Sequence, residues 1–285
     1  MCCEAYFYCF VKEYDMNELT VYEAMQGAKI DERKNEEPGI ISQGIGALLS
    51  PIGKVINFVI PQSALEGALD ACNSAGEFLA DEGDVLRDGG VKTIEELRTK
   101  DLALSDQMAN EVHNWAIGMA SVEGGAMGFW GAPGIVADIP ALMILSTRTI
   151  HKIGLCYGYE ENTEEERRFV LSILSIVGSN SLQEKRAALA ELAMIKNALK
   201  QTWKKIGEKA NEKAFTEAFI ILVRRVCEQL GINLTKRKAA QIVPIIGAGV
   251  AAAINGSYIK DVGYAAIRSY QERWLTDNEK WRDVN

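Results

Sequence analysis

Three long stretches of glycine and apolar residues most constrain how this chain can fold: residues 40–61, 121–159 and 239–259. Between them, apolar residues recur at helical spacing, and no convincing run alternates apolar and polar residues between hairpin turns. Glycine also allows helix backbones to approach closely. We therefore predict an all-α fold. Its centre consists of two Gly-rich apolar hairpins, around 121–158 and 239–270, which amphipathic helices cover.

We expect about ten helices from the periodicity, arranged as one domain over residues 17–275. An N-terminal extension over residues 1–16 precedes this domain, and a polar tail over residues 276–285 follows it. Residues 40–61 are predicted to form two short helices or one kinked helix, and residues 81–90 an acidic loop. The other expected helices cover residues 17–34, 63–81, 93–99, 105–120, 138–158, 164–177, 181–206, 210–230 and 261–275.

The balance of charges and the cysteine pattern exclude several classes of protein. Lysine and arginine total 31 and aspartate and glutamate total 39, so the net charge is −8. A chain this acidic lacks the electrostatic footprint of a general nucleic-acid binder. The 6 cysteines show no Cys-x-x-Cys spacing and there are only 2 histidines, so no zinc site is predicted. We expect no metal, no cofactor and a reducing, cytoplasmic location.

The 239–259 stretch raises the question of a membrane span, since about 20 apolar residues suffice to cross a bilayer. It contains Gln241, Pro244 and Asn255, however, and the 121–159 stretch carries charged residues that would be costly against lipid. We favour a soluble protein that offers its apolar hairpins to a bilayer or to an integral membrane partner. A wholly soluble core with close Gly/Ala helix crossings is the alternative.

Arg148 is the first candidate for a binding residue. It lies in the middle of an expected helix with apolar residues on nearly all sides, where an unpaired guanidinium would be expensive. We expect either a buried hydrogen-bond hub or a site for an anionic headgroup or phosphate. His151, one turn further along, completes this candidate anion or headgroup site.

Three polar residues in the apolar stretches are candidates for a structural hub: Glu123, Asp138 and Asn255. Glu123 and Asp138 are the acidic candidates nearest in sequence to Arg148, and Asp138 is also the expected N-cap of its helix. Asn255 lies inside the uncharged stretch, where a buried amide needs hydrogen-bond partners. These residues are expected to fix helix register.

Aromatic residues supply the candidates for membrane contact. Phe129 and Trp130 lie among glycines at an apolar turn, and an indole suits the headgroup region of a bilayer. Trp274 and Trp281 are further candidates of the same kind. Core packing is the favoured interpretation for Trp130.

No catalytic signature is recognised in the sequence. It lacks a Walker lysine motif, a Gly-x-Ser-x-Gly nucleophile motif and a zincin-like His-Glu motif. His151 and Cys156 are five residues apart, about 140° around a helix, so they form no dyad on one helix. We therefore predict no catalytic residues and favour a non-enzymatic role.

Two segments carry a family likeness. Residues 125–174 combine a Gly-rich apolar entry, a helix with a central arginine and a Tyr-Gly turn before an acidic helix start. Residues 244–275 combine a Pro-x-x-Gly-Ala pattern, a following Asn and an amphipathic exit helix. The chain resembles the EcsC family of bacterial proteins, which takes its name from a protein encoded beside an ABC transporter. The resemblance implies a helical, cytoplasmic, membrane-proximal protein and supplies no reaction.

Three functions are open at this point. The first is a membrane-associated, non-enzymatic accessory protein, peripheral at the inner face of the membrane. Its partner would be membrane lipid or, by family resemblance, an integral membrane protein such as an ABC transporter. The second is a soluble enzyme with a polar pocket near Asp138, Arg148 and His151. The third, of least weight, is a pore-forming protein that inserts its apolar hairpins.

Overall fold

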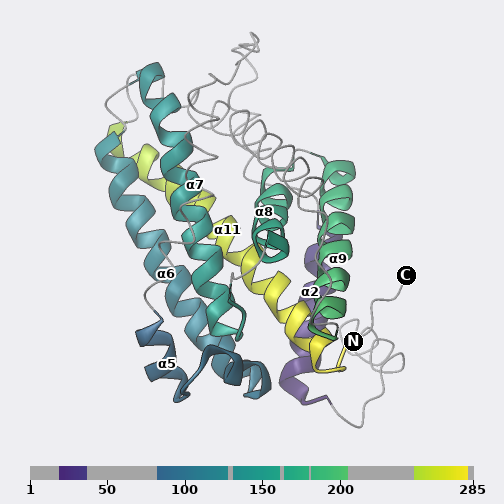
Figure 1. The fold of residues 1–285 in the computed structure, drawn as a ribbon. Helices are drawn as coiled ribbons and strands as arrows, with labels where there is room; N and C mark the ends of the chain where they lie inside the picture. Colours follow the sequence, from purple (N-terminus) through teal and green to yellow (C-terminus); the bar gives the residue numbers. More distant parts are fainter. Residues whose placement is uncertain are drawn as a thin grey trace, which may run out of the picture.

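The computed structural model describes residues 19–36, 82–127, 131–160, 164–179, 181–204 and 247–281. All regular structure in these ranges is helical, which confirms the all-α prediction (Figure 1). The helices are α2 (Val21–Asn35), α5 (Gly83–Gly89), the 3-10 helix η2 (Ile94–Thr99), α6 (Leu102–Met127), α7 (Gly131–Cys156), α8 (Glu164–Gly178), α9 (Leu182–Lys204) and α11 (Gly247–Asp277). The expected helices over 40–61, 63–81 and 210–230, and the extension over 1–16, lie outside the described residues. The total of about ten helices therefore stays a prediction.

The long helix α11 lies at the centre of the fold. It packs against α6, α7, α8 and α2 and runs obliquely among them (Figure 1). Its crossing with α6 is close because two glycines face that helix. A Cβ at Gly263 would lie 2.2 Å from Cδ2 of His113, and one at Gly256 would lie 2.5 Å from Oγ of Ser121. The absence of side chains at these two positions lets the helix backbones approach.

The continuity of α11 corrects the predicted C-terminal hairpin. The sequence indicated an apolar stretch that ends at residue 259 and a separate helix from residue 261, whereas α11 continues through Lys260. Neither Lys260 nor Asp261 is a glycine or a proline, so the helix can continue through them. Their charged side chains are tolerated at the surface of the helix. From residue 247 onward, the region expected to form the 239–270 hairpin is therefore a single helix.

α6 and α7 both begin earlier than predicted. The Asp101 carboxylate accepts a hydrogen bond from the backbone N–H of Ala103 at 3.0 Å, so Asp101 caps α6, which begins at Leu102 and not at residue 105. α7 begins at Gly131, so Asp138 is not its N-cap but lies inside the helix. Pro133 is compatible with this early start because proline is tolerated in the first turn. The two helices run antiparallel, side by side (Figure 1).

The predicted acidic loop over residues 81–90 is largely helical. α5 covers Gly83–Gly89 and ends where Gly90 adopts a left-handed backbone with φ of 61°. Gly89 is buried against the Leu97 side chain. A short helix with a glycine C-cap thus replaces the expected loop. The amphipathic helices predicted over 164–177 and 181–206 are confirmed as α8 and α9.

The core contains a buried ion pair that the sequence pattern did not predict. Arg273 on α11 donates two hydrogen bonds to the Glu166 carboxylate on α8, at 2.7 and 2.6 Å. Both side chains are almost completely buried. The buried arginine hub anticipated at Arg148 is therefore found at Arg273.

A second buried cluster surrounds Asp106 on α6. Its carboxylate accepts hydrogen bonds from the hydroxyls of Tyr22 at 2.6 Å and Tyr157 at 2.5 Å. The side-chain amide of Gln271 donates to the same carboxylate at 2.7 and 2.8 Å. Four segments far apart in the chain thus meet at one carboxylate, which fixes α2 and α11 on α6.

The described part of the predicted polar tail is packed onto the fold. Trp281 is buried and lies against α2, where a Cβ at Gly27 would come 2.3 Å from the indole. Lys280 forms a 2.7 Å ion pair with Glu23 on the same helix. Trp274 is also buried, so neither Trp274 nor Trp281 is a membrane anchor. Both belong to the core.

Candidate functional site

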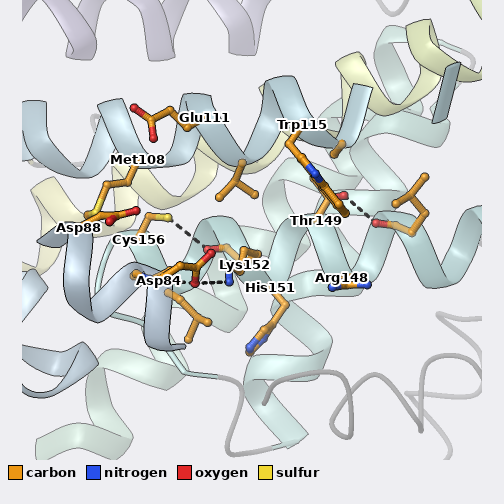
Figure 2. A pocket seen from close by; sticks show the side chains of 15 residues that line it. Asp84, Asp88, Met108, Glu111, Trp115, Arg148, Thr149, His151, Lys152 and Cys156 are labelled. Carbon is orange, nitrogen blue, oxygen red and sulfur yellow. Dashed lines mark hydrogen bonds and ion pairs between the residues drawn. The ribbon is translucent and has the colours of Figure 1, made fainter. Parts of the chain in front are cut away.

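A cavity of about 390 Å³ lies between α6 and α7, and α5 lies across one end of it. We call it the α6–α7 groove. Figure 2 shows the side chains that line it. They are Asp84, Val85 and Asp88 from α5, then Met108, Glu111, Val112, Trp115 and Ala116 from α6, then Leu145, Arg148, Thr149, His151, Lys152, Leu155 and Cys156 from α7. The volume lies within the range of small-molecule sites, about 300–1,000 Å³.

Helical periodicity explains why these residues share one groove. Residues 108, 112, 115 and 116 recur at intervals of three and four along α6, and so do residues 145, 148, 149 and 152 along α7. Residues with this spacing lie on one face of a helix. The two faces are opposed because α6 and α7 are antiparallel neighbours.

An ion pair links α5 to α7 at one end of the groove. Lys152 Nζ lies 2.5 Å from Oδ1 of Asp84 (Figure 2). Partial burial would by itself raise the pKa of Asp84, but the hydrogen bond and charge of Lys152 outweigh burial and hold this pKa below its ordinary value. Asp84 therefore stays ionised at neutral pH and anchors α5 over the groove.

Two other polar groups in the groove are hydrogen-bonded within α7. The Thr149 hydroxyl donates to the Leu145 carbonyl at 2.7 Å, and the Cys156 thiol donates to the Lys152 carbonyl at 3.3 Å. Burial raises the pKa of Cys156 to about 12, so this thiol stays protonated at neutral pH. A protonated thiol is a poor nucleophile.

The opposite end of the groove carries an exposed arginine on an exposed tryptophan. Arg148 Cζ lies 5.8 Å from the centroid of the Trp115 ring, and Trp115 is 54% exposed. Met119, one helical turn further along α6, is 37% exposed. Of the two alternatives for Arg148, the buried hydrogen-bond hub is wrong: its apolar neighbours Ile150 and Ile153 are buried on another face, and Arg148 itself is exposed at the groove rim.

The structure brings some of the predicted site residues together. Arg148 and His151 both line the α6–α7 groove, and His151 is buried there. Asp138 lies ten residues before Arg148 on α7, about 15 Å along the helix axis. The hub proposed for Glu123, Asp138 and Asn255 stays a prediction because these side chains, like Phe129 and Trp130, lie outside the described part of the structure.

Sequence analysis missed Trp115 and Lys152. Trp115 and Met119 are four residues apart on α6, a spacing that predicts a shared helix face but does not say whether the face is buried. In the acidic run over residues 81–90, Asp84 pairs with Lys152, and Asp88 pairs with Arg87 at 2.9 Å. In the ranges that the structure describes, no three His, Cys, Asp or Glu side chains cluster to hold a metal ion.

The fold and the groove define a class: an all-helical protein with a mixed apolar and charged groove on an antiparallel helix pair. None of the helices in the described ranges combines the length and apolar character needed to cross a membrane. The chain belongs to the EcsC protein family, which matches residues 24–275. This confirms the resemblance found in residues 125–174 and 244–275.

A curated relative extends over most of the chain. The uncharacterized protein YdbA of Bacillus subtilis (strain 168) is 24% identical over 250 residues, which cover 85% of this chain and 81% of YdbA. No solved structure matches the chain. The function must therefore be argued from the groove.

Proposed function

We propose that this EcsC family member is a membrane-associated, non-enzymatic accessory protein that binds phosphate-bearing lipid surfaces. The binding surface is Trp115, Met119 and Arg148, which we call the lipid-contact patch. The single observation that carries the proposal is the pairing of the exposed Trp115 indole with the Arg148 guanidinium 5.8 Å from its centroid. An amphipathic aromatic beside a cation suits the interface between headgroups and acyl chains.

Each residue of the patch has a distinct role in lipid binding. The Trp115 indole and the Met119 thioether enter the upper acyl region, because both are exposed apolar groups on the same side of α6. The Arg148 guanidinium pairs with a lipid phosphate, a geometry that suits its planar fork of donors. The net charge of −8 opposes long-range attraction to anionic membranes, so apolar insertion supplies most of the affinity.

The chemistry of the groove favours binding over catalysis. The Cys156 thiol stays protonated because burial raises its pKa to about 12. Lys152 is paired with Asp84, so its amine is held in an ion pair rather than released as a nucleophile. The enzyme alternative needs Asp138 and Arg148 in one pocket, yet the two residues lie about 15 Å apart along the axis of α7.

Liposome flotation tests the proposal. Purified protein is floated with anionic and with zwitterionic phospholipid vesicles at about 0.1 M and about 1 M salt, which shortens the Debye length from about 10 Å to about 3 Å. We expect binding to both vesicle types, with most of it surviving high salt. Trp115→Ala is expected to lower the vesicle partition coefficient roughly tenfold, because one large apolar side chain leaves the interface.

Matched controls come from another face of the molecule. Met194→Ala removes an exposed apolar side chain on α9, and Arg186→Gln removes an exposed arginine on the same helix. Neither change is expected to alter flotation, whereas Arg148→Gln is expected to weaken binding to both vesicle types, because both carry lipid phosphates, and to do so more strongly for anionic vesicles. Absence of flotation for the folded wild-type protein would reject lipid binding and leave an integral membrane protein as the partner to test.

A further inference from the structure

We infer that the α6–α7 groove binds one single-chain amphiphile, with its apolar chain inside the groove and its oxyanion head at Arg148. This inference rests on the proposed lipid function and specifies the ligand of the adjoining groove. The groove binds a single molecule taken up from the lipid surface, whereas the lipid-contact patch binds the surface itself.

The inner wall of the groove is suited to an alkyl chain. Six apolar side chains from three helices form it: Val85, Met108, Val112, Ala116, Leu145 and Leu155. Four of them, Val85, Met108, Ala116 and Leu155, also belong to the hydrophobic core, so the wall is rigidly backed. A volume of about 390 Å³ next to such a wall accepts a small apolar molecule.

Several polar groups of the groove already have partners within the protein. Thr149 and Cys156 donate to carbonyls of α7, and Lys152 donates to Asp84. A ligand that enters the groove therefore does not have to replace the hydrogen bonds of these three groups. An alkyl chain meets this requirement, whereas a polar ligand would lose its hydration without new hydrogen bonds in return.

The charges at the rim orient the amphiphile. Arg148 faces the Trp115 ring, and none of the described carboxylates lies within ion-pair distance of it. The end near α5 carries the exposed acidic side chains Asp88 and Glu111. An oxyanion is attracted by Arg148 and repelled by the acidic end, so the head lies at Arg148 and the chain points toward α5.

Calorimetric titration of the full chain with soluble amphiphiles below their micelle concentrations tests the inference. The probes are dodecanoate, decanoate, dodecyl phosphate, dodecyl maltoside and acetate. We expect one dodecanoate to bind per chain, and decanoate to bind roughly tenfold more weakly because two buried methylenes are lost. Dodecyl maltoside, with the same chain and a neutral head, is expected to bind about fivefold more weakly than dodecanoate. Acetate, which lacks the chain, is expected not to bind.

The two oxyanion probes distinguish the source of the ligand. Tighter binding of dodecanoate indicates a free fatty acid, and tighter binding of dodecyl phosphate indicates a phosphate-headed lipid. Either order supports the inference, because both molecules share the chain and the anionic head. Equal affinity for the anionic and neutral probes would overturn the assignment of the head to Arg148.

Variants locate the chain and the head separately. Val112→Phe fills the groove and is expected to abolish dodecanoate binding, whereas Val112→Ala keeps the groove open and retains binding. Arg148→Gln, at an exposed position that does not threaten folding, is expected to remove the preference for anionic over neutral heads. The Arg186→Gln control on α9 keeps that preference. Dodecanoate affinity unchanged in a folded Val112→Phe variant would overturn the inference.

Flotation separates this inference from the proposed function. Val112→Phe leaves Trp115, Met119 and Arg148 in place, so it is expected to float with vesicles as the wild type does. Wild-type protein that floats but binds no dodecanoate would overturn the groove ligand and retain the lipid-contact patch. Wild-type protein that binds dodecanoate but does not float would retain the groove ligand and reject the patch.

Discussion

Arg273 on α11 and Glu166 on α8 form a bidentate ion pair inside the protein although 107 residues separate them in the chain. The Arg273 guanidinium also lies over the Tyr159 ring, with Cζ 3.9 Å from its centroid. Burial alone would lower the pKa of Arg273, but the Glu166 carboxylate outweighs burial and raises it above its ordinary value. The Arg273 guanidinium therefore stays charged, and its ion pair with Glu166 holds α11 and α8 together.

Removing one partner of this pair is expected to be severely destabilising. Glu166→Gln leaves the buried Arg273 guanidinium with only the more distant Asp277 carboxylate, 3.8 Å from its Nε, and we expect the free energy of unfolding to fall by about 3–5 kcal/mol. Urea unfolding followed by circular dichroism measures the change. The control is Glu36→Gln, which breaks the exposed Arg33–Glu36 pair and is expected to cost less than about 1 kcal/mol. Similar losses in the two variants would contradict this interpretation.

The α6–α11 crossing is expected not to tolerate a single added methyl group at Gly263. A Cβ there would lie 2.2 Å from the His113 ring, and that ring is held by a 3.0 Å hydrogen bond between Nε2 and the Lys260 carbonyl. We expect Gly263→Ala to lower the free energy of unfolding by about 1–3 kcal/mol. Gly118→Ala on α6 meets nothing within 4 Å and is expected to be neutral or slightly stabilising. Thermal unfolding of both variants compares them, and a Gly263→Ala protein as stable as wild type would show that the crossing adjusts.

Lys185 gives the stability a defined dependence on pH. It donates to the Arg33 and Glu36 carbonyls at 2.6 Å each, at the C-terminal end of α2. Burial, assisted by the positive charge of Arg33, lowers the pKa of Lys185 from 10.5 to about 8. Between these values the unfolded chain keeps a proton that the folded chain has released, so the free energy of unfolding rises with pH in that window. Below the window Lys185 is protonated in both states and adds no pH dependence.

The comparison of wild type with Lys185→Met isolates this effect. The difference between their free energies of unfolding, measured by urea titration at about pH 7 and about pH 10, is expected to shift in favour of wild type at the higher pH. Other groups that titrate in the same range cancel because both proteins contain them. A difference that does not change with pH would show that Lys185 titrates normally in the folded state.

Cys156 is expected to resist alkylation in the native state. Its thiol is buried, and burial raises its pKa to about 12, so little thiolate is present at about pH 8. Iodoacetamide treatment followed by peptide mass spectrometry is expected to leave Cys156 unmodified in native protein and fully modified in urea. Rapid native labelling of the Cys156 peptide would indicate that the groove opens to solvent, and occupancy by dodecanoate should then slow it.

The sequence predicts helices best where one face is polar. Residues 164–177 and 181–206 have a clear amphipathic pattern, and α8 and α9 match them closely. The pattern fails in α11 because that helix is buried on several sides and buries charged residues as well as apolar ones. Arg273 and Glu272 look like surface residues in the sequence, yet both are buried. Their partners come from distant segments, which periodicity does not reveal.

The candidate site shows the same limit at a smaller scale. Arg148 and His151 could be selected from the sequence because each is a polar residue in an apolar helix. Whether each of them is exposed or buried depends on the distance between α6 and α7. This distance is a tertiary property that a local sequence pattern does not predict. Trp115 illustrates the converse, since a tryptophan in an apolar helix is ordinarily assigned to the core and here is 54% exposed.

The contact between Trp281 and Gly27 determines when folding can be completed during synthesis of the protein. α2 leaves the ribosome early, but the helix and the indole that cover it are translated more than two hundred residues later. Until α11 and Trp281 emerge, the face of α2 that carries Gly27 lacks the indole that covers it in the native fold. Native folding of the domain is therefore completed only after translation of α11 and Trp281.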